Sequence, residues 1–188
     1  MSFSSVLINF IFKRSDKKRD ENLETPKNIV RHDNIQYGKH HKWHLLDIYY
    51  PKDRKGKMPT IINIHGGGWV YGTKETYQFY CMSLAQEGFT VVNFNYGLAP
   101  TYKFPAQLDD INEVIKWTLN SQLDYPIDVK NIFLVGDSAG AHLASLYTSL
   151  CIKEEYRREI NIDIPQKFLP NALLLMVTVI LHGLERFI

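Results

Sequence analysis

Ser138 lies in a glycine-flanked pentapeptide, Gly136-Asp137-Ser138-Ala139-Gly140, whose composition is typical of a reactive serine. The residues before it, 131–135, form a short apolar run, and the residues after it have the pattern of a helix. A very tight turn between a strand and a helix leaves room only for glycines beside the serine. It also pushes the serine hydroxyl out above the edge of the sheet. The pattern therefore predicts a nucleophile elbow at Ser138.

A second motif, His65-Gly66-Gly67-Gly68-Trp69, follows another apolar run at residues 61–64. Three successive glycines allow backbone N–H groups to turn inward toward an anion without side chains in the way. Such groups stabilise the negative oxygen that forms when a nucleophile adds to a carbonyl group. A nucleophile and an anion-binding loop at two strand ends together predict acyl transfer.

Alternating strand and helix patterns surround both motifs. Period-2 or continuous apolar runs predict strands, and apolar residues three or four apart predict helices. The expected strands cover residues 43–50, 59–64, 89–95, 131–135 and 172–180, and the expected helices cover residues 74–87, 106–120 and 139–151. This alternation is typical of an α/β chain with a mostly parallel sheet and helices on both faces.

The motifs resemble those of the hormone-sensitive-lipase-like branch of the α/β-hydrolase family, which includes feruloyl-esterase-like bacterial carboxylesterases. Three blocks carry the resemblance, in the family's order, within residues 43–178: His65-Gly66-Gly67-Gly68-Trp69, then Tyr96-Gly97-Leu98-Ala99-Pro100 with Phe104-Pro105-Ala106, then Gly136-Asp137-Ser138-Ala139-Gly140. The family usually has arginine where Gly97 stands. This departure puts the local packing of that loop in question.

The resemblance implies hydrolysis of a small-molecule carboxylic ester through a serine acyl-enzyme, without metal or cofactor. It implies Ser138 as the catalytic nucleophile, and the backbone N–H groups of Gly67, Gly68 and Ala139 as the oxyanion hole. The remaining motif residues are His65, Gly66, Gly136, Asp137 and Gly140. Asp137 is expected to be structural, and His65 belongs to the oxyanion motif rather than serving as the base.

A serine hydroxyl also needs a histidine to take its proton and an acid to orient that histidine. In this fold the acid and then the histidine follow the serine along the chain. His142 comes one helical turn after Ser138 and is expected to pack or to face solvent, whereas His182 comes earlier than the family places its histidine. Asp163 precedes the last expected strand, at its wrong end. The remaining acidic candidates have the spacing of a solvated helix face: Glu154, Glu155 and Glu159.

The sequence thus predicts an α/β-hydrolase domain that is incomplete at its C-terminal end and inactive by itself. Residues 177–188 also lack the small-residue turn expected there. Three functional interpretations remain open. The chain is the N-terminal portion of a serine carboxylesterase, or a non-catalytic remnant or binding module, or, less favoured, a serine peptidase of the same fold.

The N-terminal residues 1–30 are expected to form an apolar segment and a charged arm, and residues 31–188 the partial α/β-hydrolase domain. The apolar stretch at 6–12 is far shorter than the ~20 residues that a membrane span needs. It also lacks the flanks of a signal peptide. We expect a short packing helix there, then a flexible arm at residues 13–21, and no stable membrane anchor.

Charge and cysteine content narrow the remaining function classes. The formal net charge is +2, from 22 basic and 20 acidic residues, so no overall field favours nucleic acid. Two cysteines are too few for a disulfide framework, and Cys81 falls on an apolar helical face. We therefore expect a cytoplasmic protein.

The apolar run at residues 172–181 is expected to be an exposed strand edge through which chains associate.

Overall fold

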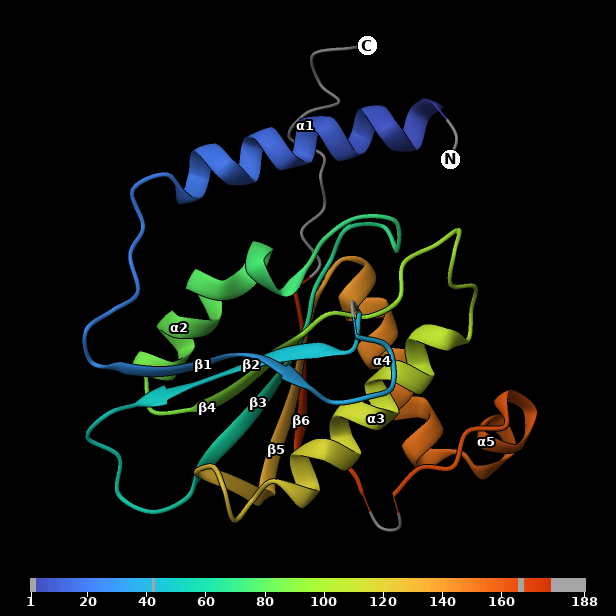
Figure 1. Cartoon of the computed structure of the whole chain (residues 1–188). Coiled ribbons are helices and arrows are strands. Elements are labelled where there is room, and N and C mark those ends of the chain that lie inside the picture. Colours follow the sequence, from blue (N-terminus) through green and yellow to red (C-terminus); the bar gives the residue numbers. More distant parts are fainter. Residues whose placement is uncertain (1–2, 42, 166–167, 177–188) are drawn as a thin grey trace.

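The computed structural model describes residues 3–41, 43–165 and 168–176, which build a six-stranded sheet in the order β1-β2-β4-β3-β5-β6 (Figure 1). The strands are β1 (Ile29–Gln36), β2 (Leu45–Pro51), β3 (Met58–Ile64), β4 (Thr90–Phe94), β5 (Ile127–Asp137) and β6 (Ala172–Met176). The helices are α1 (Phe3–Asp20), the 3₁₀ helix η1 (Lys74–Tyr77), α2 (Gln78–Gln86), α3 (Ala106–Asn120), α4 (Ala139–Ile152) and α5 (Glu154–Ile160).

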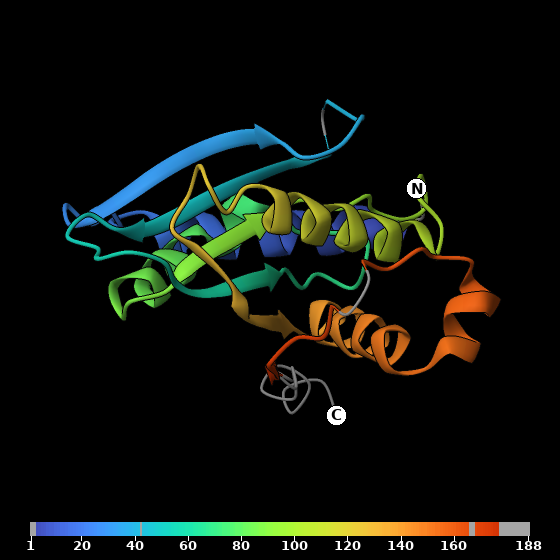
Figure 2. The same cartoon turned by 90° about the horizontal axis from the view of Figure 1, so that it is seen from below.

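The sheet has an antiparallel part and a parallel part. β1, β2 and β4 pair antiparallel, whereas β4, β3, β5 and β6 run parallel. The chain passes from β3 to β4 in one direction and then returns across β3 to β5 and β6. Because crossovers between parallel strands are right-handed, this reversal puts α2 on one face of the sheet and α3 and α4 on the other, as Figure 1 shows. Figure 2 shows β1 and β6 at opposite edges.

Both faces of the sheet are buried. Side chains of β3 alternate between them: Ile62 and Ile64 join the core under α3 and α4, while Ile61 joins the core under α2. Cys81 of α2 is fully buried in that second core, as predicted. Burying an aliphatic side chain stabilises the fold by about 1.5–3 kcal/mol, so these two cores hold the strand ends in place. The mostly parallel α/β architecture with helices on both faces is therefore confirmed.

The N-terminal arm is helical. α1 runs through the charged residues to Asp20, and Arg19 pairs with Asp16 one turn earlier at 3.0 Å. Three basic residues lie in its last turn, where the helix dipole favours cations. The prediction of a flexible arm is therefore wrong for residues 13–20. In the described part of the chain no helix, α1 included, is long and apolar enough to cross a membrane.

Strand β1 was not predicted. It is an edge strand with mostly polar residues, and only its first residue, Ile29, is fully buried, so it lacks a strong apolar alternation. It begins before the domain boundary expected at residue 30, and that division stays a prediction. The predicted last strand is present as β6 up to Met176, and its residues 177–180 lie outside the described residues. Association through that edge also stays a prediction.

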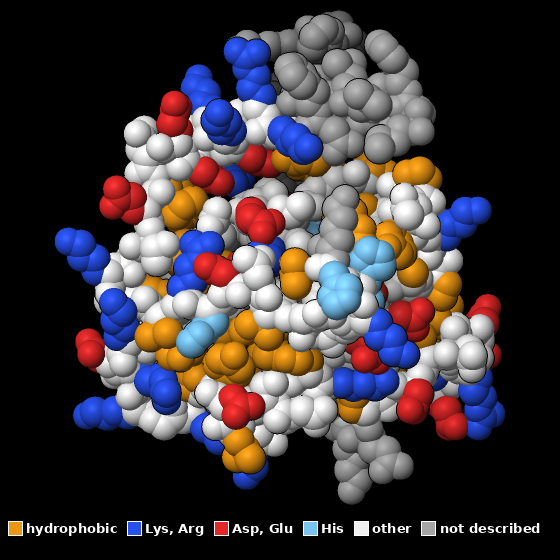
Figure 3. Space-filling view, viewed as in Figure 1, with side chains coloured by type: hydrophobic (Ala, Val, Ile, Leu, Met, Phe, Trp, Pro, Cys, Tyr) orange, Lys and Arg blue, Asp and Glu red, His pale blue; other side chains and the backbone are white. Residues whose placement is uncertain are grey.

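Charged side chains of both signs are interspersed over the face seen in Figure 3. They form no continuous stripe of one sign on that face. The expectation that the protein has no nucleic-acid partner is untested and stays a prediction.

Candidate active site

Ser138 is an exposed residue at the turn between β5 and α4. Its φ of 50° and ψ of −112° are strained for a residue with a side chain. A Cβ on Gly136 would lie 2.5 Å from the carbonyl carbon of Gly140, and a Cβ on Gly140 would lie 2.0 Å from the carbonyl oxygen of Ile64. A side chain at Gly136 would collide with the first turn of α4, and a side chain at Gly140 would collide with the end of β3. The tight elbow predicted at Ser138 is present.

Replacing Gly140 with alanine is expected to lower the free energy of unfolding by about 3 kcal/mol, the upper end of the usual cost of overpacking. The reason is the contact with the Ile64 carbonyl, which cannot move without bending β3. Urea denaturation measures the change. Gly56→Ala is the uncrowded control. Gly56 differs from the helical Gly140 in having a positive φ, of 72°, and no atom lies within 4 Å of the added Cβ. This control should cost only about 1 kcal/mol. Equal losses in the two variants would contradict the close packing of the elbow.

The loop after β3 has three successive residues with positive φ: 119° at Gly67, 59° at Gly68 and 63° at Trp69. The amides of Val70 and Tyr71 donate to the Gly67 carbonyl oxygen at 3.2 and 3.0 Å, which closes the loop. A Cβ on Gly67 would lie 2.1 Å from the Tyr71 carbonyl oxygen, whereas the same position at Gly68 has no atom within 4 Å. The space beside Gly68 is therefore open.

The three expected oxyanion donors are the N–H groups of Gly67, Gly68 and Ala139. No described residue accepts a hydrogen bond from any of them. Ala139 is the first residue of α4, whose amino end carries a partial positive charge. Gly67 and Gly68 line the same cavity as Ser138.

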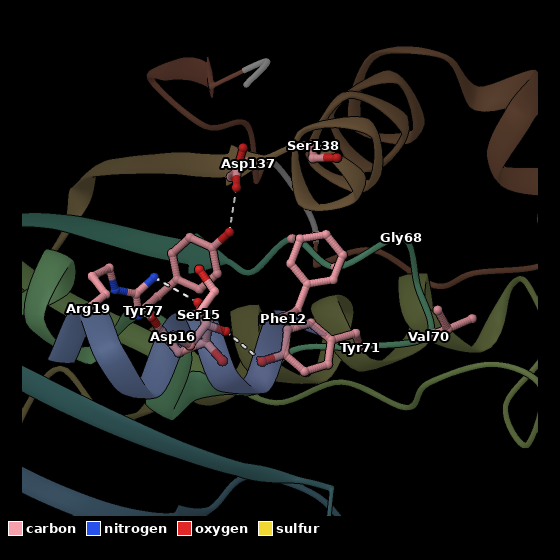
Figure 4. A pocket seen from close by; sticks show the side chains of 13 residues that line it. Phe12, Ser15, Asp16, Arg19, Gly68, Val70, Tyr71, Tyr77, Asp137 and Ser138 are labelled. Carbon is pink, nitrogen blue, oxygen red and sulfur yellow. Dashed lines mark hydrogen bonds and ion pairs between the residues drawn. The ribbon is translucent and has the colours of Figure 1, made fainter. Parts of the chain in front are cut away.

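That cavity has a volume of about 540 Å³ and is closed on one side by α1 (Figure 4). The ring of Phe12 stacks on Tyr71, with centroids 5.6 Å apart, and the Tyr71 hydroxyl donates to Asp16 at 2.5 Å. Arg19 pairs with Asp16 and donates to a backbone oxygen of η1 at 2.6 Å. The charged groups that α1 places in this wall are therefore paired with protein groups, and the stacked rings make part of the wall apolar.

His65 is buried beneath the loop. Its Nδ1 donates to the Gly66 carbonyl oxygen at 2.8 Å, and its ring stacks on Tyr96 with centroids 4.1 Å apart. Nε2 is buried without a partner among the described residues. Burial lowers the pKa of His65 to about 4, so the imidazole is neutral at pH 7. These contacts fit a structural role in the loop, as expected from the motif.

No described histidine side chain hydrogen-bonds to the Ser138 hydroxyl, and the backbone N–H of His142 donates to the Ser138 carbonyl oxygen at 3.0 Å. His142 is exposed, and its ring meets the edge of Trp69 with centroids 5.5 Å apart. Asp163 lies beyond α5, where its backbone carbonyl accepts from Asn112 at 3.0 Å. The glutamates 154, 155 and 159 are exposed on α5, as the helix-face spacing indicated. His182 lies outside the described residues. Within those residues no group of three His, Cys, Asp or Glu could hold a metal ion.

The loop at Gly97 is packed despite the missing arginine. Its N–H donates to Asp110 at 2.7 Å, and a Cβ on Gly97 would lie 2.5 Å from the ring of Tyr102. The other Asp110 oxygen pairs with His44 at 3.0 Å. Burial raises the pKa of Asp110, while the Gly97 amide and His44 oppose this rise. Tyr102 therefore fills the space beside Gly97, and Asp110 anchors the loop.

Two polar contacts at the site, the first half-buried and the second buried, were not predicted. Tyr77 donates to Asp137 at 2.5 Å, and Lys74 pairs with Asp47 at 2.9 Å. Their partners are far apart in the sequence, 60 residues in the first pair, so no local pattern indicates them. Both pairs hold η1, which lies between the glycine loop and α2.

Residues 46–168, more than half of the chain, match the model of one protein family, BD-FAE, and all three sequence motifs lie in this range. This chain belongs to the BD-FAE family.

Curated relatives of this BD-FAE chain include esterases. Arylacetamide deacetylase of Bos taurus is 36% identical over 104 residues, which cover 52% of this chain and 26% of that protein. Esterase LipQ of Mycobacterium tuberculosis is 34% identical over 115 residues, which cover 60% of this chain and 27% of that protein. The chain thus spans about a quarter of the length of these relatives.

Solved structures confirm the α/β-hydrolase fold of the BD-FAE chain. Esterase B from Lactobacillus rhamnosis, crystallised with a tributyrin phosphonate inhibitor, superposes with a TM-score of 0.83 at 28% identity. The match covers 93% of this chain and 59% of that one. A hyperthermophilic esterase from Pyrobaculum calidifontis superposes with a TM-score of 0.65 at 26% identity, over 85% of this chain and 50% of that one.

Proposed function

We propose that this chain carries the nucleophile and the oxyanion hole of a carboxylic ester hydrolase. The observation that carries the proposal is the strained, exposed Ser138 in the same cavity as Gly67 and Gly68. A reactive hydroxyl next to unpaired backbone N–H groups suits attack on a carbonyl. The names of the relatives, an arylacetamide deacetylase and several esterases, support an ester as the substrate.

In the proposed reaction the Ser138 oxygen attacks the ester carbonyl carbon, and the carbonyl π electrons move onto its oxygen. The N–H groups of Gly67, Gly68 and Ala139 hold this oxyanion, and the amino end of α4 adds a favourable field. Collapse of the intermediate expels the alcohol and leaves the acyl group on Ser138. Water then releases the acid by the same two steps. The hydroxyl proton must pass to a base, and no described histidine side chain is hydrogen-bonded to the Ser138 hydroxyl to receive it.

Covalent trapping tests the proposal. Prolonged incubation with a p-nitrophenyl alkylphosphonate should add one phosphonyl group, which peptide mass spectrometry locates on Ser138. Ser138→Ala should remove the adduct. Ser145→Ala, a change of the same kind further along α4, should keep it. An adduct on another residue, or none at all, would contradict the proposed nucleophile.

A further inference from the structure

Three segments of the site meet at one side-chain pair. Tyr77, at the end of η1, reaches to Asp137, the residue before Ser138, and its hydroxyl donates to Asp137 Oδ2 at 2.5 Å (Figure 4). A Cβ on Gly66 would lie 2.9 Å from the Tyr77 hydroxyl oxygen and 2.8 Å from the Asp137 carbonyl oxygen. The first glycine of the oxyanion loop therefore rests directly on the pair.

In this contact Tyr77 is the hydrogen-bond donor and the Asp137 carboxylate is the acceptor. Burial and the Asp137 carboxylate raise the pKa of Tyr77, so the phenol keeps its proton and donates it to the carboxylate. The second carboxylate oxygen, Oδ1, is buried and has no partner among the described residues. Within those residues Tyr77 is thus the hydrogen-bond donor on which the Asp137 side chain depends.

The helix that carries Tyr77 is itself fixed. Lys74, at the start of η1, is buried, and its ammonium group pairs with Asp47 of β2 at 2.9 Å. Its backbone N–H donates to Asn95 at 2.6 Å, and its carbonyl accepts from Asn93 at 2.7 Å. These bonds tie η1 to the sheet, so the position of the Tyr77 hydroxyl is set by the core and not by the loop that rests on it.

We propose that Tyr77 and Asp137 are positioning residues that hold the oxyanion loop at a fixed distance from Ser138. The inference rests on the proposed function, in which Gly67 and Gly68 must meet the oxygen of a group bound to Ser138. Neither residue of the pair is required to touch the reacting atoms. They act through Gly66 on one side and through the backbone of the elbow on the other.

Backbone NMR of the full chain tests the proposal without turnover. In Tyr77→Phe, the amide order parameters of Gly66, Gly67, Gly68 and Ala139 should fall from about 0.85, typical of rigid backbone, toward about 0.6. Tyr147→Phe is the control, because Tyr147, which is buried where Tyr77 is half-buried, is another tyrosine whose hydroxyl donates to a side chain, Asn112, at 2.7 Å. It should leave the four amides unchanged. Asp137→Asn keeps an acceptor for Tyr77 and should also keep them rigid.

Kinetics separate this inference from the proposed function. If the chain hydrolyses p-nitrophenyl acetate, Tyr77→Phe should lower kcat by about 100-fold with KM nearly unchanged, as expected for a misplacement near 1 Å. Unchanged amides in Tyr77→Phe, or an unchanged kcat in an active chain, would overturn the positioning role. A chain that is neither active nor phosphonylated, but whose four amides loosen in Tyr77→Phe alone, would refute the proposed function and leave the pair standing.

Discussion

The 188-residue chain is expected to hydrolyse p-nitrophenyl acetate at only a residual rate. When a member of a serine triad is removed, the oxyanion hole and substrate binding alone leave about 10³–10⁴-fold over water, orders of magnitude below the intact enzyme. The described part of the chain resembles an enzyme from which a triad member has been removed. It has the strained serine and the glycine loop, whereas His65 is buried and neutral, and His142 contacts Trp69.

This prediction is tested by measuring the hydrolysis rates of four proteins, each with and without one additive. Initial rates are compared for the unchanged chain and for Ser138→Ala, His142→Ala and His182→Ala, with and without added imidazole. If a base is what the site lacks, imidazole should accelerate the unchanged chain, because it can take the hydroxyl proton from solution. Ser138→Ala should show no acceleration beyond the buffer reaction. His142→Ala should behave as the unchanged chain.

Full esterase activity would overturn the expectation of a residual rate. If His182→Ala then removed that activity, His182 would be the base, although it lies outside the described residues. A residual rate that imidazole does not raise, and that Ser138→Ala does not change, would instead favour the non-catalytic interpretation. In that case the cavity beside Ser138 would be a binding site at most.

The parts of the site that could be predicted from the sequence are those where local crowding favours particular residue types. The elbow at Ser138 and the loop at Gly67 contain glycines at which any side chain would meet backbone atoms, and each motif directly follows an apolar strand. A Cβ added to Gly140, Gly67 or Gly136 would lie 2.0–2.5 Å from another atom, which explains why glycines in these motifs indicate the local structure. The order of strands and helices was predictable for a similar reason, because buried parallel strands are apolar on both faces.

Contacts between distant segments were not predictable. The cavity wall formed by α1 depends on Phe12 and Asp16 meeting Tyr71, which lies 55 residues from Asp16. The charge density of residues 13–21 indicated a flexible arm, yet ion pairs one turn apart and contacts with the loop keep residues 13–20 helical. In the same way, nothing near Tyr77 in the sequence indicates Asp137 as its partner. Such pairs follow from the packing of the sheet, not from local propensity.

Acidification is expected to destabilise the fold through His65. The pKa of His65 is lowered to about 4 in the folded protein, whereas an unfolded histidine has an ordinary pKa near 6.5. Between these values the unfolded state binds more protons, so the free energy of unfolding falls as the pH falls from about 6.5 to about 4. The stabilisation is present above the unfolded pKa and is lost as the pH falls through the folded one. At about 1.4 kcal/mol for each pKa unit, the total loss is about 3 kcal/mol.

Urea denaturation of the unchanged chain and of His65→Asn at several pH values between 7.5 and 4 isolates this contribution. Asparagine can still donate to the Gly66 carbonyl but does not titrate, and it loses the stacking on Tyr96, so the variant should be less stable at pH 7.5. Its free energy of unfolding should nevertheless fall by about 3 kcal/mol less than that of the unchanged chain on acidification. His142→Ala removes an exposed histidine and should keep the full pH dependence. If the free energy of unfolding depended on pH equally in His65→Asn and in the unchanged chain, His65 would accept a proton without unfolding the loop. The buried imidazole would then not be what limits the stability of the fold in acid.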